Sequence, residues 1–224
     1  MIGSKRNQKL VAGGKRFGIK AWADYFHYGD EEECPFLIYI GGAISPKDYR
    51  RRRDTLPEPI TREFEKAFTS DKSLDLLIIP NPLFDDSLLS WSRGEFLQFL
   101  VFDLLPQTTN PRPPALGVVG YSRGAFLAAC LAFDLPRVVA AALIGGSDTT
   151  DAVKDGVSKD KKFMLYSNAD DPLVMENYVF MKMLVDRGMN CDADLREGGH
   201  EFDDYAGNGS VADAFRYVIS NLGY

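Results

Sequence analysis

A serine flanked by glycines is the feature of this sequence that points most directly to chemistry. The pentapeptide Gly120-Tyr121-Ser122-Arg123-Gly124 follows the β-rich run 116–119 and precedes the strong helix former 125–132. A serine in a tight strand-to-helix turn is strained and exposes its Oγ, and small residues two positions to either side let the strand and helix approach closely. The helix start adds N–H groups and a positive dipole end that suit a developing oxyanion. We therefore expect Ser122 to be a nucleophile.

A serine hydroxyl needs a general base, and the sequence offers only two histidines. His27 lies far upstream, in an expected edge strand, where we interpret it as a partly exposed strand histidine. His200 lies in Glu197-Gly198-Gly199-His200-Glu201-Phe202, just past the last expected strand, where two glycines allow a loop to swing the imidazole over the sheet end. We expect His200 to be the base.

The base needs an acceptor that fixes its tautomer and stabilises the imidazolium. Two neighbouring carboxylates, Asp170 and Asp171, follow the expected strand 162–166 on a turn before Pro172. We expect Asp171 to be the acceptor, with Asp170 as the alternative, because one of the pair can instead form the turn and cap the next helix. The chain order Ser122, Asp171, His200 places three functional residues after three different strands.

Short apolar runs alternate with helical patterns from residue 17 onward, which predicts an α/β protein with a single doubly wound, mostly parallel sheet and helices on both faces. We expect an antiparallel N-terminal edge hairpin, formed by a strand near residues 17–25 and the strand 36–40. The remaining expected strands are 74–79, 116–120, 138–143, 162–166 and 191–195, and the expected helices are 61–69, 92–105, 122–133, 175–187 and 211–222. Residues 17–224 form one domain in this prediction.

The charge distribution separates the start of the chain from the rest. The 224 residues carry a formal net charge of −6, yet residues 1–16 contain five basic and no acidic side chains. We interpret residues 1–16 as a mobile basic arm. The overall acidity argues against nucleic-acid binding, no apolar run is long enough to span a membrane, and no signal peptide is expected. Three scattered cysteines fit a reducing, cytoplasmic location.

At this point the sequence resembles the α/β-hydrolase family over residues 17–224, through GYSRGA at the nucleophile, SNADDPLV at the acid and EGGHEF at the histidine. A further match is Ile40-Gly41-Gly42-Ala43, which looks like the family's oxyanion loop although many members have His-Gly where this chain has Ile40-Gly41. The resemblance implies oxyanion donors at the backbone N–H groups of Ala43 and Arg123. It also implies a lidless site, because only about sixteen residues separate the strands that usually flank the family's helical lid.

The expected pocket walls are four segments beyond the strand ends: Ser45–Pro57, Asn81–Trp91, Gly146–Asp160 and Gly199–Asn208. Phe84 and Trp91 are candidates for an acyl-side surface or for simple packing. The run Arg50–Arg53 either receives an acidic substrate group or is a solvated helix start.

We expect a serine hydrolase that cleaves carboxylic esters through an acyl-enzyme. The alternatives are an acyl-thioesterase or peptidase on the same three residues, or a non-catalytic relative that binds a ligand or partner. The substrate partner is a small ester or thioester, with neither nucleic acid nor membrane involved, and the sequence does not indicate an oligomeric state. Phosphate-cradling glycine motifs and zinc-ligand spacings are both missing from the sequence, so no cofactor and no metal are expected.

Overall fold

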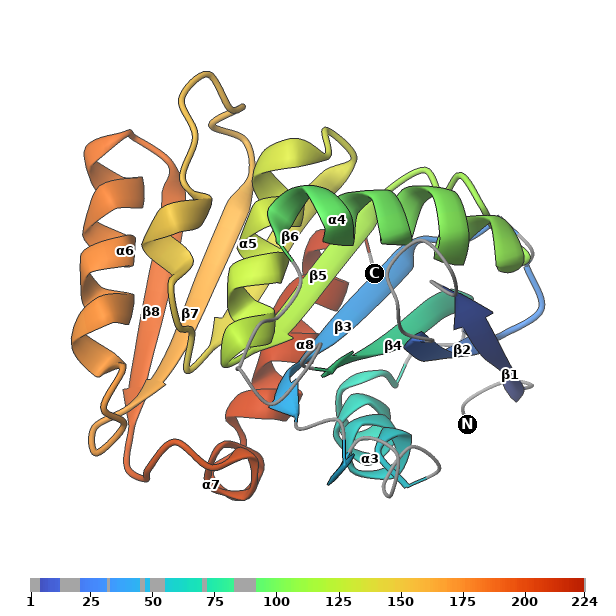
Figure 1. Ribbon diagram of the computed structural model, residues 1–224, viewed down its shortest axis with the longest axis horizontal. Helices are drawn as coiled ribbons and strands as arrows, with labels where there is room; N and C mark the ends of the chain where they lie inside the picture. Colours follow the sequence, from blue (N-terminus) through green and yellow to red (C-terminus); the bar gives the residue numbers. More distant parts are fainter. Residues whose placement is uncertain are drawn as a thin grey trace.

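A computed structural model describes residues 5–12, 21–31, 33–44, 47–48, 55–69, 72–82 and 92–223. One sheet of eight strands runs through it, in the order β1-β2-β4-β3-β5-β6-β7-β8 (Figure 1). The strands are β1 (Lys5–Ala12), β2 (Ala21–Tyr28), β3 (Phe36–Ile44), β4 (Leu74–Pro82), β5 (Leu116–Tyr121), β6 (Val138–Ile144), β7 (Lys162–Asn168) and β8 (Asn190–Arg196).

From β4 through β3, β5, β6 and β7 to β8, each strand is parallel to the next one in the sheet, whereas β2 is antiparallel to both β1 and β4. This arrangement confirms the predicted fold class, a mostly parallel doubly wound sheet with an antiparallel edge at the N-terminus. The strands in the middle of the sheet are apolar along their whole length because helices cover both of their faces.

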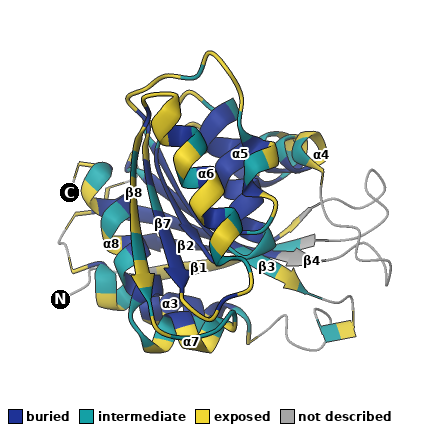
Figure 2. Cartoon of the chain, turned by 90° about the vertical axis from the view of Figure 1, so that its left-hand side faces the viewer, coloured by how far each residue is buried: buried dark blue, intermediate teal, exposed yellow. Residues whose placement is uncertain are grey.

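Helices lie on both faces of the sheet (Figure 2). One face is covered by α4 (Arg93–Gln98), α5 (Arg123–Asp134) and α6 (Val174–Asp186), and the other by α3 (Pro57–Ala67), α7 (Phe202–Gly207) and α8 (Ser210–Asn221). Each layer has its own buried core, with Leu127 and Phe180 in the first and Phe64 and Phe215 in the second. None of the helices in the described ranges is long and apolar enough to cross a membrane.

Two expectations for the N-terminal region are wrong. The segment 1–16 was expected to be a mobile arm, but Lys5–Ala12 forms β1, whose register runs from Lys5 opposite Tyr28 to Ala12 opposite Ala21. The strand near residues 17–25 was expected to form a hairpin with 36–40. Its described part, β2, pairs instead with β1 and β4, and β4 separates it from β3. The antiparallel edge hairpin therefore consists of β1 and β2.

Smaller differences concern the helices. The expected helix 92–105 is divided into α4, a π-type turn over Phe99–Leu104 and a 3-10 turn over Leu105–Gln107. It begins with a capping box, in which the Ser92 hydroxyl accepts from the Glu95 N–H while the Glu95 carboxylate accepts from the Ser92 N–H. Two short elements, α7 and a 3-10 turn over Thr149–Ala152, have no counterpart among the expected helices. Of these, α7 matters most because it lies beside His200.

Candidate active site

Ser122 occupies the turn between β5 and α5 in a conformation that few residues adopt. Its φ of 53° and ψ of −125° are unusual for a residue with a Cβ atom. Such a backbone costs roughly 1–3 kcal/mol and persists only where its surroundings hold it in place. Here the Ser122 N–H donates to the Ile144 carbonyl of β6 at 2.8 Å, and the Ser122 carbonyl accepts from the Ala125 N–H at 2.9 Å.

The glycines on either side of this turn allow three backbone segments to meet. A Cβ on Gly120 would lie 2.4 Å from the Gly124 carbonyl oxygen and 2.6 Å from the Ala125 Cα. A Cβ on Gly124 would lie 2.3 Å from the carbonyl oxygens of both Ile40 and Gly41. These separations leave no space for a side chain, so the pentapeptide is what brings β5, α5 and the end of β3 together.

The structure brings Ser122, His200 and Asp171 together from the ends of three strands. The Ser122 Oγ lies 3.0 Å from the His200 Nε2, and the His200 Nδ1 lies 2.8 Å from the Asp171 Oδ2. Since one imidazole nitrogen contacts the hydroxyl and the other contacts the carboxylate, the ring can accept the serine proton while the carboxylate stabilises the resulting imidazolium. The His200 side chain is 29% exposed, so an incoming group can reach it.

The two neighbouring aspartates have different surroundings. The Asp171 carboxylate is fully buried, its Oδ1 accepts from the Leu173 N–H at 2.7 Å, and its Oδ2 accepts from the Tyr205 hydroxyl at 2.5 Å as well as facing His200. Asp170 is exposed, and its backbone N–H donates to the Gly198 carbonyl. Of the two carboxylates, it is therefore the carboxylate of Asp171 that contacts His200.

Several hydrogen bonds to the backbone of residues 199–200, together with one ring contact, hold the loop that carries His200. The Asn168 side-chain amide donates to the Gly199 carbonyl at 2.9 Å, and the Gly199 N–H donates to the Asp204 carboxylate at 3.2 Å. The Tyr121 hydroxyl donates to the His200 carbonyl, and the two rings stack with centroids 5.8 Å apart. His200 is thus positioned by residues of β5, β7 and α7.

Asn168, Asp204 and Tyr205 are residues of this site that the sequence reasoning missed. These residues were missed because α7, which is only six residues long, was not recognised as a helix. The acids Asp203 and Asp204 in its first turn, with Gly207 as its last residue and Asn208 directly after it, are typical of a short helix. Reading the segment as a helix would have placed Tyr205 inside the fold rather than in an open loop.

The end of β3 passes beside the candidate nucleophile. The register with β4 is irregular between Ile40 and Ala43, so Gly41 and Gly42 form a local distortion, after which Ala43 lies opposite Asn81. A Cβ on Gly42 would lie 3.2 Å from the Ser122 Cβ. Arg123 is the first residue of α5, and its guanidinium pairs with Asp148 and lies 4.6 Å from the Phe126 ring centroid. The oxyanion roles of the Ala43 and Arg123 N–H groups remain a prediction.

A cavity of about 630 Å³ adjoins the candidate site on the side of α3 and α7. The glycines 41–42 and Tyr121 form the wall next to Ser122. The rest combines apolar side chains such as Leu56, Ile60 and Phe202 with three carboxylates, those of Glu58, Glu201 and Asp203. Of the expected pocket walls, Phe84, Trp91 and Arg50–Arg53 lie outside the described residues. The segment between Ile144 and Lys162 is fully described and contains one 3-10 turn rather than an inserted layer of helices.

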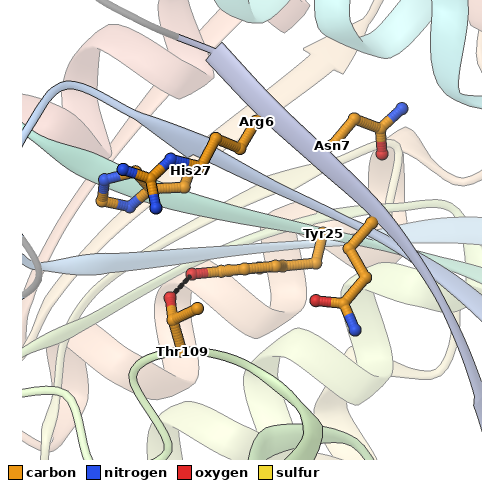
Figure 3. A pocket seen from close by; sticks show the side chains of 6 residues that line it. Arg6, Asn7, Tyr25, His27 and Thr109 are labelled. Carbon is orange, nitrogen blue, oxygen red and sulfur yellow. Dashed lines mark hydrogen bonds between the residues drawn. The ribbon is translucent and has the colours of Figure 1, made fainter.

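His27 is buried, contrary to the expectation of a partly exposed strand histidine, because β1 pairs alongside it with Arg6 opposite. Its Nδ1 lies 2.8 Å from the Asp75 Oδ1, which also accepts from the Tyr25 hydroxyl at 2.7 Å. His27 and Tyr25 line a separate cavity of about 200 Å³, where the Tyr25 hydroxyl contacts Thr109 (Figure 3).

The ligand-type atoms of His27, Cys34 and Asp75 all lie within 4.8 Å of one another, so this cluster is the candidate for a metal among the described residues. Two nitrogen or oxygen ligands of a tetrahedral zinc ion lie about 3.3 Å apart, given metal–ligand distances of about 2.0–2.1 Å. The His27–Asp75 pair is closer than that, at a hydrogen-bonding distance of 2.8 Å. Burial also raises the pKa of the Cys34 thiol to about 12. We therefore interpret the cluster as a buried hydrogen-bonded group.

No family model matches this chain, and no curated protein matches its sequence. Solved structures, however, match it over nearly its whole length. A ferulic acid esterase shares 13% identity over 96% of this chain and 98% of its own, with a TM-score of 0.69. An esterase of Pyrobaculum calidifontis shares 14% over 96% and 85%, with a TM-score of 0.66. A fluorophosphonate-binding serine hydrolase of Staphylococcus aureus shares 13% over 97% and 99%, with a TM-score of 0.63.

Identities this low carry information on the fold alone. The match covers 96% of this chain with TM-scores of 0.69 and 0.66, and this chain has a mostly parallel eight-stranded sheet. The protein therefore has the α/β-hydrolase fold.

Proposed function

We propose that this protein is a serine hydrolase that cleaves carboxylic esters through an acyl-enzyme. The observation that carries the proposal is the continuous hydrogen-bonded line from the Ser122 Oγ through both nitrogens of His200 to the buried Asp171. A strained serine backbone at the start of this line is a second sign of a catalytic site, because strain of this kind concentrates at active sites.

In the acylation step, the Ser122 Oγ attacks the ester carbonyl carbon while the His200 Nε2 takes the hydroxyl proton. The carbonyl oxygen becomes an oxyanion, which the N–H groups of Ala43 and Arg123 stabilise in this proposal. When the tetrahedral intermediate collapses, the bond to the alkoxy oxygen breaks and His200 returns the proton to the leaving alcohol. Asp171 keeps the Nδ1 proton of His200 in place and stabilises the imidazolium throughout.

In the deacylation step, a water molecule replaces the alcohol. His200 removes a proton from this water as it attacks the acyl carbon, and the second tetrahedral intermediate releases the acid and restores the Ser122 hydroxyl. Ser122, Asp171 and His200 follow the carboxyl ends of β5, β7 and β8, and ligands bind beyond such strand ends in open α/β sheets, which supports the proposal.

The cavity beside Gly42 and Tyr121 is the proposed site for the apolar part of the ester. Its volume of about 630 Å³ falls in the usual range for small-molecule pockets, roughly 300–1,000 Å³. Several solved structures of this fold carry the name esterase, which favours carboxylic esters as substrates. Thioesters and peptide bonds would undergo the same steps. We also propose a cytoplasmic location, in keeping with three cysteines that form no disulfide.

The test is fluorophosphonate labelling and ester hydrolysis with the wild type and Ser122→Ala. We expect the probe to label the wild type once, at Ser122. In Ser122→Ala we expect no labelling and a fall in kcat of several orders of magnitude, as when a triad serine is lost. Ser147→Ala is a matched control, because this serine lies on the neighbouring β6 loop and its contact with Ser122 is through the backbone.

Labelling at another serine, or full turnover by Ser122→Ala, would refute the assignment. A folded wild type that neither reacts with the probe nor hydrolyses oxygen esters, thioesters or peptides would favour the non-catalytic binding protein.

A further inference from the structure

The carboxylate that faces His200 has a second hydrogen-bond donor on the same oxygen. The Asp171 Oδ2 lies 2.8 Å from the His200 Nδ1 and 2.5 Å from the Tyr205 hydroxyl. Two donors on one oxygen share its negative charge. We infer that Tyr205 is a positioning residue, and this inference rests on the proposed function. The hydrogen bond from Tyr205 limits the negative charge with which Asp171 stabilises the imidazolium form of His200, and it thereby influences the pH at which His200 becomes a neutral base.

The surroundings of Tyr205 leave its hydroxyl one direction in which to donate. Its oxygen accepts the Asn168 backbone N–H at 3.2 Å, so the hydroxyl proton points to Asp171. Burial, together with the hydrogen bond to Asp171 and the charge of that carboxylate, raises the pKa of Tyr205 well above its ordinary value. The phenol therefore keeps its proton, and the donation persists throughout the working pH range.

The contact is closed to solvent on the side of β6. A Cβ on Gly145 would lie 2.8 Å from the Tyr205 hydroxyl oxygen and 2.9 Å from the Asp171 Oδ2, so backbone packs directly against the pair. Both Tyr205 and the Asp171 side chain are essentially unexposed. Because water has little access, removing the hydroxyl would leave His200 as the one remaining donor to this oxygen among the described residues.

The expected sign follows from this change. Without the tyrosine donor, the Asp171 Oδ2 is a stronger acceptor, and it stabilises the imidazolium form of His200 more than the neutral form. The titration midpoint of His200 should therefore rise in Tyr205→Phe. A hydrogen bond to a carboxylate is strong enough for a shift of about half to one pH unit, given that only part of its strength passes to the histidine.

Other titratable and charged groups surround the pair, and the variant changes none of them. Tyr121 at the end of β5 interacts electrostatically with Asp171 and with three acids of the α7 segment, Glu201, Asp203 and Asp204. Asp170 precedes Asp171 after β7, and Arg123 at the start of α5 pairs with Asp148 of the β6 loop. A difference between the wild type and Tyr205→Phe therefore reports on the hydroxyl alone.

The experiment is an NMR titration with ring-labelled histidine. The chain contains only two histidines, and His200→Gln identifies the signal of His200. We expect its midpoint to rise in Tyr205→Phe and to stay unchanged in Tyr28→Phe, a control that removes the hydroxyl of an equally buried tyrosine whose partner is Glu65. An unchanged or lowered midpoint in a folded Tyr205→Phe would overturn the inference.

A second variant gives the opposite sign and keeps the shape of the side chain. Replacing Tyr205 by 3-fluorotyrosine makes the phenol more acidic and hence a stronger donor, so the midpoint should fall. This variant decides the matter if Tyr205→Phe does not fold. Equal midpoints in the wild type and the fluorotyrosine protein would contradict the inference.

The same proteins are then assayed for ester hydrolysis. On the acid side of the kcat/KM profile, Tyr205→Phe should lose about threefold to tenfold, the amount that follows from a midpoint raised by half to one unit. A wild type without activity would refute the proposed function while the NMR titration still decides on Tyr205. An active wild type with the same profile in Tyr205→Phe would refute the role of Tyr205 and leave the function intact.

Discussion

Replacing Asp171 by asparagine tests the arrangement around His200 most sharply, because every described hydrogen-bond partner of this carboxylate is a donor. Oδ1 faces the Leu173 backbone N–H at 2.7 Å, and Oδ2 faces the His200 Nδ1 and the Tyr205 hydroxyl. The asparagine amide has one oxygen and one NH₂ group. Its NH₂ group must therefore face either the Leu173 N–H or the pair formed by His200 and Tyr205.

The two orientations differ in cost. The Leu173 N–H is a backbone donor that cannot become an acceptor, so an NH₂ group facing it loses a buried hydrogen bond, at about 1–3 kcal/mol. On the other side, the Tyr205 oxygen has a further lone pair, and His200 can move its proton from Nδ1 to Nε2 and accept at Nδ1. We therefore expect the amide oxygen to stay at Leu173 and the NH₂ group to face His200.

This orientation preserves the fold and inactivates the base. With its proton on Nε2, which lies 3.0 Å from the Ser122 Oγ, His200 cannot accept the serine proton. The wrong tautomer costs about 10⁴-fold in kcat in a serine protease triad, and we expect a fall of that order in Asp171→Asn. The free energy of unfolding should change by less than about 2 kcal/mol, since one orientation satisfies most partners.

Hydrolysis of nitrophenyl acetate measures the first effect, and urea unfolding measures the second. The matched control is Asp170→Asn, which makes the same exchange one residue earlier on an exposed side chain and should keep activity within a fewfold of the wild type. A loss below tenfold in Asp171→Asn, or a larger loss in Asp170→Asn, would show that Asp171 does not control the tautomer of His200.

Two further predictions concern the turn and the cavity. Gly120→Ala should lower the free energy of unfolding, measured by urea titration, by about 1–3 kcal/mol. The added Cβ would lie 2.4 Å from a backbone oxygen of α5 and would push β5 and α5 apart. Stability equal to that of the wild type would contradict this prediction. Leu56→Trp should reduce kcat/KM for hexanoate esters while leaving acetate esters nearly unchanged, because Leu56 lines the cavity at its α3 wall; equal effects on both esters would place the acyl chain elsewhere.

The sequence carried most information where a local pattern determines the structure. The pentapeptide around Ser122 predicted the turn between β5 and α5 because its glycines are required by close backbone contacts, which depend on residue type rather than on distant packing. The fold class was also predictable, since apolar runs alternating with helical patterns leave few alternatives to a parallel sheet with helices on both faces.

Pairing between distant segments was the part that local patterns could not determine. Nothing in residues 21–28 indicates that β2 pairs with β4 rather than β3, because either neighbour would bury the same side chains. The basic residues of the first segment suggested a solvated arm, yet Leu10 is buried against the sheet, and Lys9 lies near Asp24. The formation of β1 also explains the burial of His27.

The difference between Asp170 and Asp171 shows where pattern reasoning reaches its limit at the site. Both carboxylates follow β7, and adjacent residues in a turn point in different directions, so composition alone leaves the choice open. What distinguishes them is the Leu173 N–H, which holds the Asp171 carboxylate inward, and Tyr205 of α7, which closes over its other oxygen. A helix as short as α7 has little stability of its own and forms through its packing on the fold. A tertiary contact, the hydrogen bond from Tyr205, therefore helps to determine that Asp171 is the acid that faces His200. Because this contact depends on the packing of α7, the role of Tyr205 could not be predicted from local sequence patterns.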